Sequence, residues 1–167
     1  MKMKSKKNIS IFLVEDDPVY ASTLKYDLSS DHSYKIKVFS SGEECVKKLY
    51  LNPDIILLDY YLNGKLNGID VLRKIQRFGE NIQVIFLSGQ EKIEVAANVM
   101  KHGAYDYVVK NETAFIRVKG LIKKILNYNK LVKENRDFKK FQAFILFVLL
   151  IGIVSVVVIN YMHPELF

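Results

Sequence analysis

Cysteine is nearly absent from this 167-residue sequence, in which Cys45 is the only one. A single thiol excludes an internal disulfide and is too few for a structural zinc site. The N-terminal residues, MKMKSKKN, also lack the apolar core and the small-residue cleavage site of a signal peptide. We therefore expect the domain that follows them to stay in the cytosol.

The positive charge of the chain is distributed unevenly. Residues 1–109 contain 15 Lys and Arg against 14 Asp and Glu, whereas residues 110–140 contain 10 against 3. Basic residues that flank an apolar segment are typical of the cytoplasmic side of a membrane span, where anionic headgroups attract them. The basic character therefore indicates a nearby membrane, and we expect no binding to nucleic acid.

Short β-rich apolar segments alternate with longer amphipathic segments between residues 8 and 109. This alternation predicts parallel strands joined by helices, and right-handed crossovers arrange them as a three-layer α/β sandwich. Several strands lack polar alternation, which indicates that both faces of the sheet are covered. The expected strands are 9–14, 35–39, 54–58, 83–87 and 107–109, and the expected helices are 19–28, 43–51, 69–78 and 93–101.

Polar residues follow the expected strands at the edge where open parallel sheets bind their ligands. Carboxylates gathered there would repel one another unless a cation lay among them, and Mg²⁺ prefers oxygen ligands. Asp17 precedes Pro18 and suits a helix cap as well as a metal site, so both alternatives stay open. The residues at this edge are Glu15, Asp16 and Asp17 after the first strand, Asp59 after the third, Ser88 after the fourth and Lys110 after the fifth.

Four segments at these strand ends carry a resemblance to a known family. FLVEDDP, IILLDYYL, VIFLSG and YDYVVK together resemble the receiver domains of bacterial two-component response regulators, the CheY-like family, over about 120 residues. The resemblance implies a doubly wound, flavodoxin-like sheet of five parallel strands in the order 2-1-3-4-5. It also implies a signalling domain rather than an enzyme, with at most self-catalysed phosphotransfer and autodephosphorylation.

The resemblance assigns a role to each residue at the strand ends. Asp59 would accept a phosphoryl group from a histidine kinase or a phosphotransfer protein. Ser88 and Lys110 would contact the phosphoryl oxygens, and Tyr107, packed outward beforehand, would change rotamer together with Ser88 as the switch. Mg²⁺ would be held by the carboxylates of Glu15, Asp16 and Asp59 and by the backbone carbonyl of Tyr61.

Two other functions compete with the phosphorylated switch. A pseudo-receiver scaffold that takes no phosphate should have lost the acidic pair or the lysine, and both are present. An aspartate-based phosphatase should have a second aspartate two residues after Asp59, where the sequence has Tyr61. The sequence also departs from the family's common form, because Asn63 and Asn111 stand at positions where proline is frequent.

The C-terminal third of the chain is expected to be helical throughout. Residues 113–140 contain no proline, and their first part carries an apolar stripe that would pack on the sheet. Residues 141–162 contain no charge and are long enough to cross the hydrocarbon layer, for which about 20 helical residues suffice. Lys139 and Lys140 before this segment place the N-terminal domain on the cytoplasmic side. A buried core helix and a partner-binding tail are the alternatives.

The expected organisation is therefore a membrane-tethered switch. It would meet membrane lipid through its tail and a downstream protein near the bilayer. Pairing of two copies stays open, because Gly152 and Ser155 lack the spacing of the glycine dimer motif. The expected parts are a receiver domain at 1–126, a basic helical stalk at 127–140, a single transmembrane helix at 141–162 and a short tail at 163–167.

Overall fold

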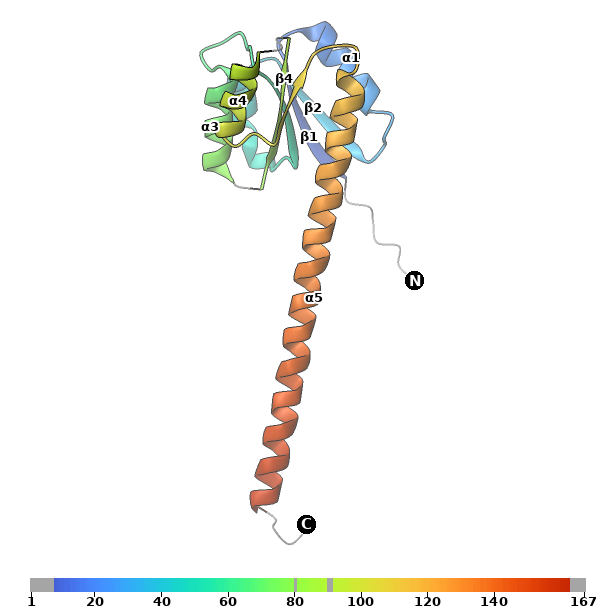
Figure 1. Ribbon diagram of the computed structural model, residues 1–167, viewed down its shortest axis with the longest axis vertical. Helices are drawn as coiled ribbons and strands as arrows, with labels where there is room; N and C mark the ends of the chain where they lie inside the picture. Colours follow the sequence, from blue (N-terminus) through green and yellow to red (C-terminus); the bar gives the residue numbers. More distant parts are fainter. Residues whose placement is uncertain (1–7, 80, 90–91, 163–167) are drawn as a thin grey trace. The chain divides into compact units, whose positions relative to one another are not determined.

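The computed structural model describes residues 8–79, 81–89 and 92–162 (Figure 1). The chain divides into two compact units, Met1–Lys123 and Lys124–Phe167. Every expected strand is present, with its ends shifted by at most one residue. The strands are β1 (Ile9–Val14), β2 (Tyr34–Phe39), β3 (Ile55–Asp59), β4 (Gln83–Ser88) and β5 (Asp106–Val109), and the helices are α1 (Pro18–Leu28), α2 (Gly42–Lys47), α3 (Gly68–Phe78), α4 (Ile93–Lys101) and α5 (Ala114–Met162).

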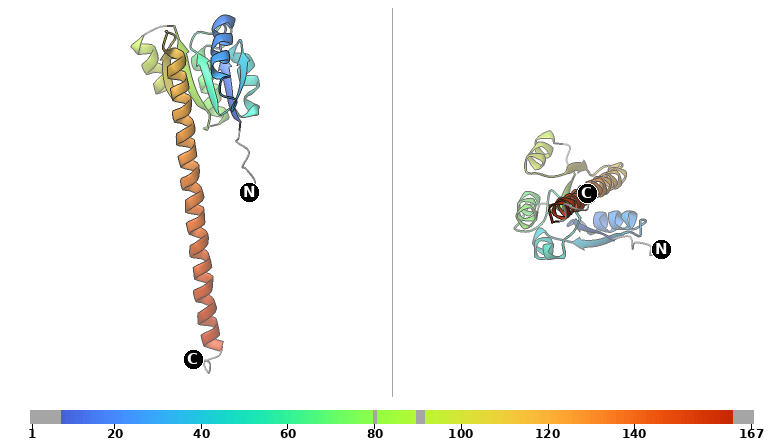
Figure 2. Two further views of the ribbon diagram at one scale, coloured as in Figure 1. Left: turned by 90° about the vertical axis from the view of Figure 1, so that its right-hand side faces the viewer. Right: turned by 90° about the horizontal axis from the view of Figure 1, so that it is seen from below.

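The five strands form one parallel sheet in the order β2-β1-β3-β4-β5, which confirms the predicted topology. Helix α1 and the first turns of α5 cover one face of this sheet, and α2, α3 and α4 cover the other (Figure 2). The strand order reverses at β1 and β3, which lie side by side. Ligands of open α/β sheets bind beyond the carboxyl ends of the strands at such a reversal.

The core lies between the central strands and the two helical layers. All five residues of β3 are buried, as expected for a strand covered on both faces. On the face of α2, α3 and α4, Phe12, Leu58 and Phe86 pack with Leu72 and Ile75, which recur at helical spacing along α3. Each fully buried side chain of this size contributes about 1.5–3 kcal/mol, so this packing fixes the strand ends that carry the polar residues.

The predicted helix at 43–51 is interrupted in the structure. Helix α2 ends at Lys47, and a 3-10 turn, Leu49–Leu51, follows it. Asn52 has a φ of 49° and ends this turn in the left-handed conformation, which asparagine tolerates better than most residues. Pro53 comes next, and proline disfavours the α conformation for the residue before it. The chain therefore leaves the helix before β3 begins.

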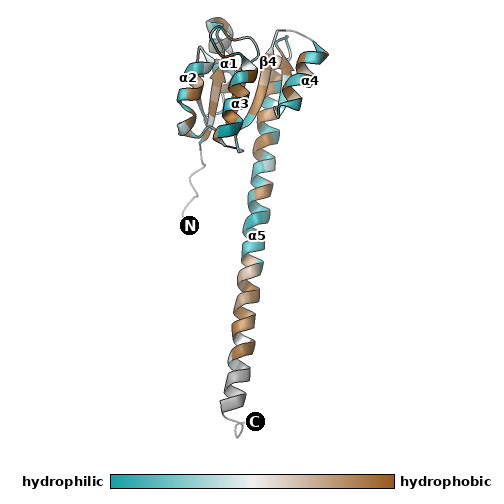
Figure 3. Cartoon of the chain, turned by 90° about the vertical axis from the view of Figure 1, so that its left-hand side faces the viewer, coloured by the Kyte–Doolittle hydropathy of each residue, from teal (hydrophilic) through white to brown (hydrophobic). Residues whose placement is uncertain are grey.

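Helix α5 is continuous over its 49 residues. A hydrophilic stretch along it is followed by a hydrophobic one (Figure 3). Phe144 and Leu146 illustrate the hydrophobic stretch, with 62% and 67% of their surface exposed. Among the described residues, this one helix is long and apolar enough to cross a membrane, with a mean hydropathy of 1.9 in its most apolar window. The expected tail at 163–167 lies outside the described residues.

Candidate functional site

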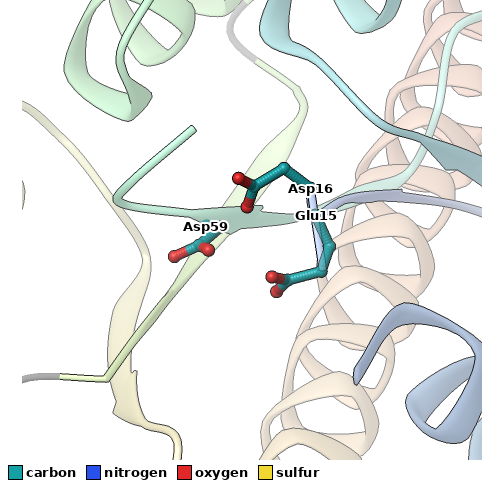
Figure 4. A group of neighbouring side chains, drawn as sticks. All are labelled: Glu15, Asp16 and Asp59. Atoms are coloured by element: carbon teal, nitrogen blue, oxygen red, sulfur yellow. The ribbon is translucent and has the colours of Figure 1, made fainter. Parts of the chain in front are cut away.

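Three carboxylates converge at the carboxyl ends of β1 and β3 (Figure 4). Glu15 and Asp16 follow β1, and Asp59 is the last residue of β3. One oxygen from each of the three residues lies within 4.8 Å of the others. Glu15 and Asp59 are buried, with exposed fractions of 2% and 4%, and Asp16 is half-buried. Because β1 and β3 are neighbours, the fold brings together residues that are 44 positions apart, and the cluster could hold a metal ion.

The ammonium group of Lys110 lies among these carboxylates. Its Nζ is 2.7 Å from Asp59 Oδ2 and 2.7 Å from Glu15 Oε2. The backbone N–H of Lys110 donates to the carbonyl of Ser88 at 2.7 Å, which places the lysine at the end of the neighbouring strand. The ring of Tyr20 lies 4.7 Å from the ammonium and adds a cation–π contact. The positive charge offsets the repulsion between the two buried carboxylates.

Burial changes the proton affinity of this cluster. Desolvation raises the pKa of Glu15 to about 7; the hydrogen bond from Lys110 opposes the rise, and the charge of Asp59 adds to it. Burial alone would lower the pKa of Lys110, but its hydrogen bonds to Asp59 and Glu15 raise it. The ammonium therefore stays charged at neutral pH, while Glu15 titrates near neutrality.

We expect Glu15 to make the metal-free protein less stable as the pH rises from about 4.5 to about 7. Folded Glu15 keeps its proton up to about 7, whereas the unfolded group loses it near 4.5, so the folded state binds the additional proton in this window. The free energy of unfolding then falls with rising pH, by on the order of 3 kcal/mol.

Urea unfolding in the presence of a chelator, at pH 5 and pH 8, measures this effect. Other carboxyl groups titrate in the same range, so the quantity of interest is the difference between the wild type and Glu15→Gln. We expect the variant to gain stability relative to the wild type at pH 8. An equal pH dependence in both proteins would contradict the raised pKa.

Backbone contacts place two further residues of the loops around the cluster, Asp17 and Tyr61. Asp17 Oδ1 accepts hydrogen bonds from the N–H groups of Val19 at 2.8 Å and Tyr20 at 3.2 Å. Asp17 is therefore the N-cap of α1, as the helix-cap alternative expects. The N–H of Tyr61 donates to Asp59 Oδ1 at 3.2 Å, so the backbone that carries the expected carbonyl ligand lies directly beside Asp59.

The two expected switch residues are both buried. Ser88 ends β4 with no exposed surface, between the strands that carry Asp59 and Lys110. Tyr107 is 7% exposed and belongs to the core cluster on the face of α3 and α4. The expectation that Tyr107 packs outward is thus wrong for this structure. Its ring fits among apolar side chains, and burial of a large aromatic surface stabilises that position.

Sequence reasoning missed several residues that support the site. Besides Tyr20, these include Asn63, whose Nδ2 donates to Asp16 Oδ2 at 2.5 Å. Glu43 accepts hydrogen bonds from the N–H groups of Lys65 and Leu66, at 2.7 and 3.0 Å; both residues lie with Asn63 in the loop between β3 and α3. The sequence offered one signal for this contact, namely that Asn63 stands at a position where proline is frequent. The sequence does not say which carboxylate the Asn63 side chain reaches.

Gly68, at the start of α3, makes a close approach to the strand that carries Asp59. A Cβ at this position would lie 2.7 Å from the carbonyl oxygen of Asp59 and 2.8 Å from the ring of Phe86. We expect Gly68→Ala to destabilise the protein by about 1–3 kcal/mol, because the backbone of β3 has no room to move. Urea unfolding measures the loss. Gly79→Ala is the control, because nothing lies within 4 Å of its Cβ position, and equal effects would contradict the close approach.

Comparison with known proteins identifies the family to which the chain belongs. A model of the family described as Response regulator receiver domain matches residues 11–125, which include all of the converging residues. The chain belongs to the response regulator receiver family. Receiver domains of two-component systems interact with histidine kinases or phosphotransfer proteins, and they bind Mg²⁺ through an acidic pocket.

Curated relatives of this receiver are longer than the chain. The transcriptional regulatory protein MalR of Bacillus subtilis is 31% identical over 104 residues, which cover 61% of the chain and 44% of MalR. An NtrX-like response regulator of Rickettsia felis is 30% identical over 136 residues, which cover 78% of the chain and 28% of that protein. The chain therefore spans less than half the length of these relatives.

Solved structures of receiver domains share the fold. The signal receiver domain of a LuxO repressor protein from Vibrio parahaemolyticus superposes with a TM-score of 0.69 at 25% identity, covering 75% of this chain and 95% of that one. A CheX–CheY–BeF3–Mg complex from Borrelia burgdorferi gives a TM-score of 0.63 at 26% identity, covering 71% of this chain and 89% of the matched one. These likenesses confirm the flavodoxin-like sheet.

Proposed function

We propose that this receiver is a phosphoryl-accepting switch, phosphorylated on Asp59 by a histidine kinase or phosphotransfer protein and held at a membrane by the hydrophobic part of α5. The observation that carries the proposal is the position of Asp59. It is a buried carboxylate with an ammonium 2.7 Å from Oδ2 and two further carboxylates beside it. This arrangement suits the reception of a phosphoryl group better than a purely structural role.

The donor atoms at the site fit a magnesium ion. The cluster offers only oxygen ligands, which hard divalent cations prefer, and the similar Borrelia structure is a complex with BeF3 and Mg²⁺. In our proposal the ligands are the carboxylates of Glu15, Asp16 and Asp59 and the backbone carbonyl of Tyr61. Bound there, Mg²⁺ would neutralise charge on the phosphoryl oxygens.

The protein's own groups position the phosphoryl transfer. One oxygen of Asp59 forms a bond to phosphorus as the bond between phosphorus and the donor's imidazole nitrogen breaks; the imidazole keeps the electron pair and takes up a proton. Lys110 moves from the carboxylates to a phosphoryl oxygen and stabilises the negative charge there. The hydroxyl of Ser88 donates a hydrogen bond to a second phosphoryl oxygen. The shift of Ser88 towards Asp59 would alter the packing around the buried Tyr107 and with it the populations of the Tyr107 rotamers, and this population shift is the signal.

Incubation of the full chain in detergent micelles with Mg²⁺ and acetyl phosphate tests the proposal. Intact mass spectrometry should show one added HPO₃ group, which Asp59→Ala should abolish. If the wild type forms no adduct and beryllium fluoride does not bind either, the pseudo-receiver scaffold is the better interpretation. Turnover of a phosphorylated substrate would instead support the phosphatase alternative.

The membrane part of the proposal depends on the exposed surface of α5. Large apolar side chains along residues 141–155 lie at the surface of the described chain, among them Phe147 at 59% and Ile153 at 65%. Contiguous apolar surface of this kind marks a membrane or a partner, and the length and lack of charge favour a bilayer. The basic residues before it support a receiver on the cytoplasmic side, where it would contact anionic lipid and act on a downstream protein nearby.

A further inference from the structure

Asn63 reaches from the loop between β3 and α3 to the acidic cluster. Its amide Nδ2 donates to Asp16 Oδ2 at 2.5 Å, across 47 residues of sequence. We propose that Asn63 is a positioning residue, which holds Asp16 ready for the divalent cation and so raises the affinity of the site for it. This inference rests on the proposed magnesium site and adds a residue that governs its affinity.

Asp16 differs from the other two carboxylates in what holds it. Lys110 binds Asp59 and Glu15 through its ammonium, and both are buried. Asp16 is half-buried, and its Oδ2 is held by the neutral amide of Asn63. A hydrogen bond from a neutral group leaves the negative charge of the carboxylate intact, and Oδ1 takes no part in this hydrogen bond. Asn63 therefore orients the ligand without competing with the ion for charge.

The loop that carries Asn63 is itself anchored on its other side. Glu43, in the first turn of α2, accepts the N–H groups of Lys65 and Leu66 at 2.7 and 3.0 Å. Gly64 lies between Asn63 and these residues with a φ of 155°, in a region that favours glycine, and a Cβ there would meet the Glu43 carboxylate. The amide of Asn63 is thus presented by a loop segment fixed at two points, on α2 and on Asp16.

Fixing a ligand before the ion arrives has a known energetic consequence. Hydrogen-bond partners of metal ligands hold the ligand's orientation, and their loss typically weakens metal binding by about 10–100-fold. A side chain that is already ordered also loses less conformational freedom on binding. Asn63 is exposed, so water competes with its hydrogen bond, and we expect an effect near the lower end of this range.

Isothermal titration of the full chain in detergent micelles with MgCl₂, without any phosphodonor, tests this role. Asn63→Ala should weaken Mg²⁺ binding about tenfold. Asn98→Ala is the matched control, because Asn98 is the same residue type and lines the same cavity of about 600 Å³ next to Asp16. It should leave the affinity within about twofold of the wild type, and the urea midpoint of Asn63→Ala should show that the variant is folded.

The outcomes separate this inference from the function on which it rests. Equal Mg²⁺ affinity in the wild type and Asn63→Ala, or equal losses in Asn63→Ala and Asn98→Ala, overturns the role of Asn63 and leaves the phosphoryl switch standing. Failure of the wild type to bind Mg²⁺ overturns both the magnesium site and the role of Asn63. As a second variant, Glu43→Gln should weaken Mg²⁺ binding less than Asn63→Ala, because it loosens the loop while keeping the amide. An equal or larger loss would contradict the role of Asn63, because the loop as a whole would then control the Mg²⁺ affinity.

Discussion

Lys110→Met is expected to slow phosphorylation of Asp59 by acetyl phosphate about a hundredfold or more, at saturating Mg²⁺. The ammonium lies 2.7 Å from Asp59 Oδ2 with only 16% of the side chain exposed, so it is a fixed charge at the point where the phosphoryl oxygens must arrive. Removal of one preorganised electrostatic group from such a site typically costs a factor of about 10²–10³ in rate. Methionine keeps the unbranched, apolar part of the side chain and removes the charged ammonium.

The rate is measured as the growth of the phosphorylated species in intact mass spectra. Lys119→Met serves as the control, because Lys119 also forms a close ion pair, with Asp27 at 2.6 Å, but does so away from the carboxylate cluster. The Lys119→Met variant should be phosphorylated at the rate of the wild type. If Lys110→Met slows the reaction no more than Lys119→Met, the lysine has no part in the transfer and serves only to balance the charge of Glu15 and Asp59.

Removal of residues 141–162 should move the protein from the membrane fraction to the soluble fraction almost completely. Within this segment, 14 of the 16 residues in FILFVLLIGIVSVVVI are Leu, Ile, Phe or Val. Each contributes about 0.3–0.6 kcal/mol to membrane insertion, which gives about 4–8 kcal/mol in all. A change of that size shifts the partition by a factor of about 10³ or more. Fractionation of cells followed by a carbonate wash and immunoblotting measures the distribution.

A substitution that keeps the chain length provides a second form of this experiment. The double variant Leu149→Arg with Ile153→Arg places two charges in the middle of the segment, each of which costs about 2.5–3.5 kcal/mol there. It should leave the membrane fraction, whereas deletion of residues 127–140 should not. If carbonate releases the wild-type protein, or if the protein without 141–162 stays with the membrane, the anchor must be sought elsewhere.

The sheet was predictable because its signal is local. Apolar runs such as those of β3 and β4 identify buried strands by themselves, and the rule for parallel sheets then brings Asp59, Ser88 and Lys110 to one edge. The break after α2 was missed because it lies in the backbone conformation of Lys48, with a φ of −109° and a ψ of 6°, and not in the apolar pattern. A helix-terminating signal, proline at position 53, was nevertheless present in the sequence.

Side-chain contacts across the site were less predictable than the strand ends. Asn63 meets Asp16, and Tyr20 meets Lys110, only through the conformations of the loop after β3 and the first turn of α1. Propensities do not determine these conformations. The orientation of Tyr107 was mistaken for a related reason, since outward and buried rotamers use the same backbone and differ only in what the ring packs against.

The close burial of Lys110 with Glu15 and Asp59 bears on how the protein responds to osmotic stress. Dissolved salt screens charges over about 8 Å at physiological ionic strength, and it acts far less on groups shielded from water. These three groups are in contact at 2.7 Å with side chains 16%, 0% and 6% exposed, so a change in cytoplasmic salt should scarcely alter their mutual attraction. The exposed lysines before the apolar segment have no such protection. If the receiver is tethered to a membrane as we propose, their attraction to anionic lipid would weaken as salt rises, and a cell that loses water would alter this attraction before it altered the chemistry of Asp59.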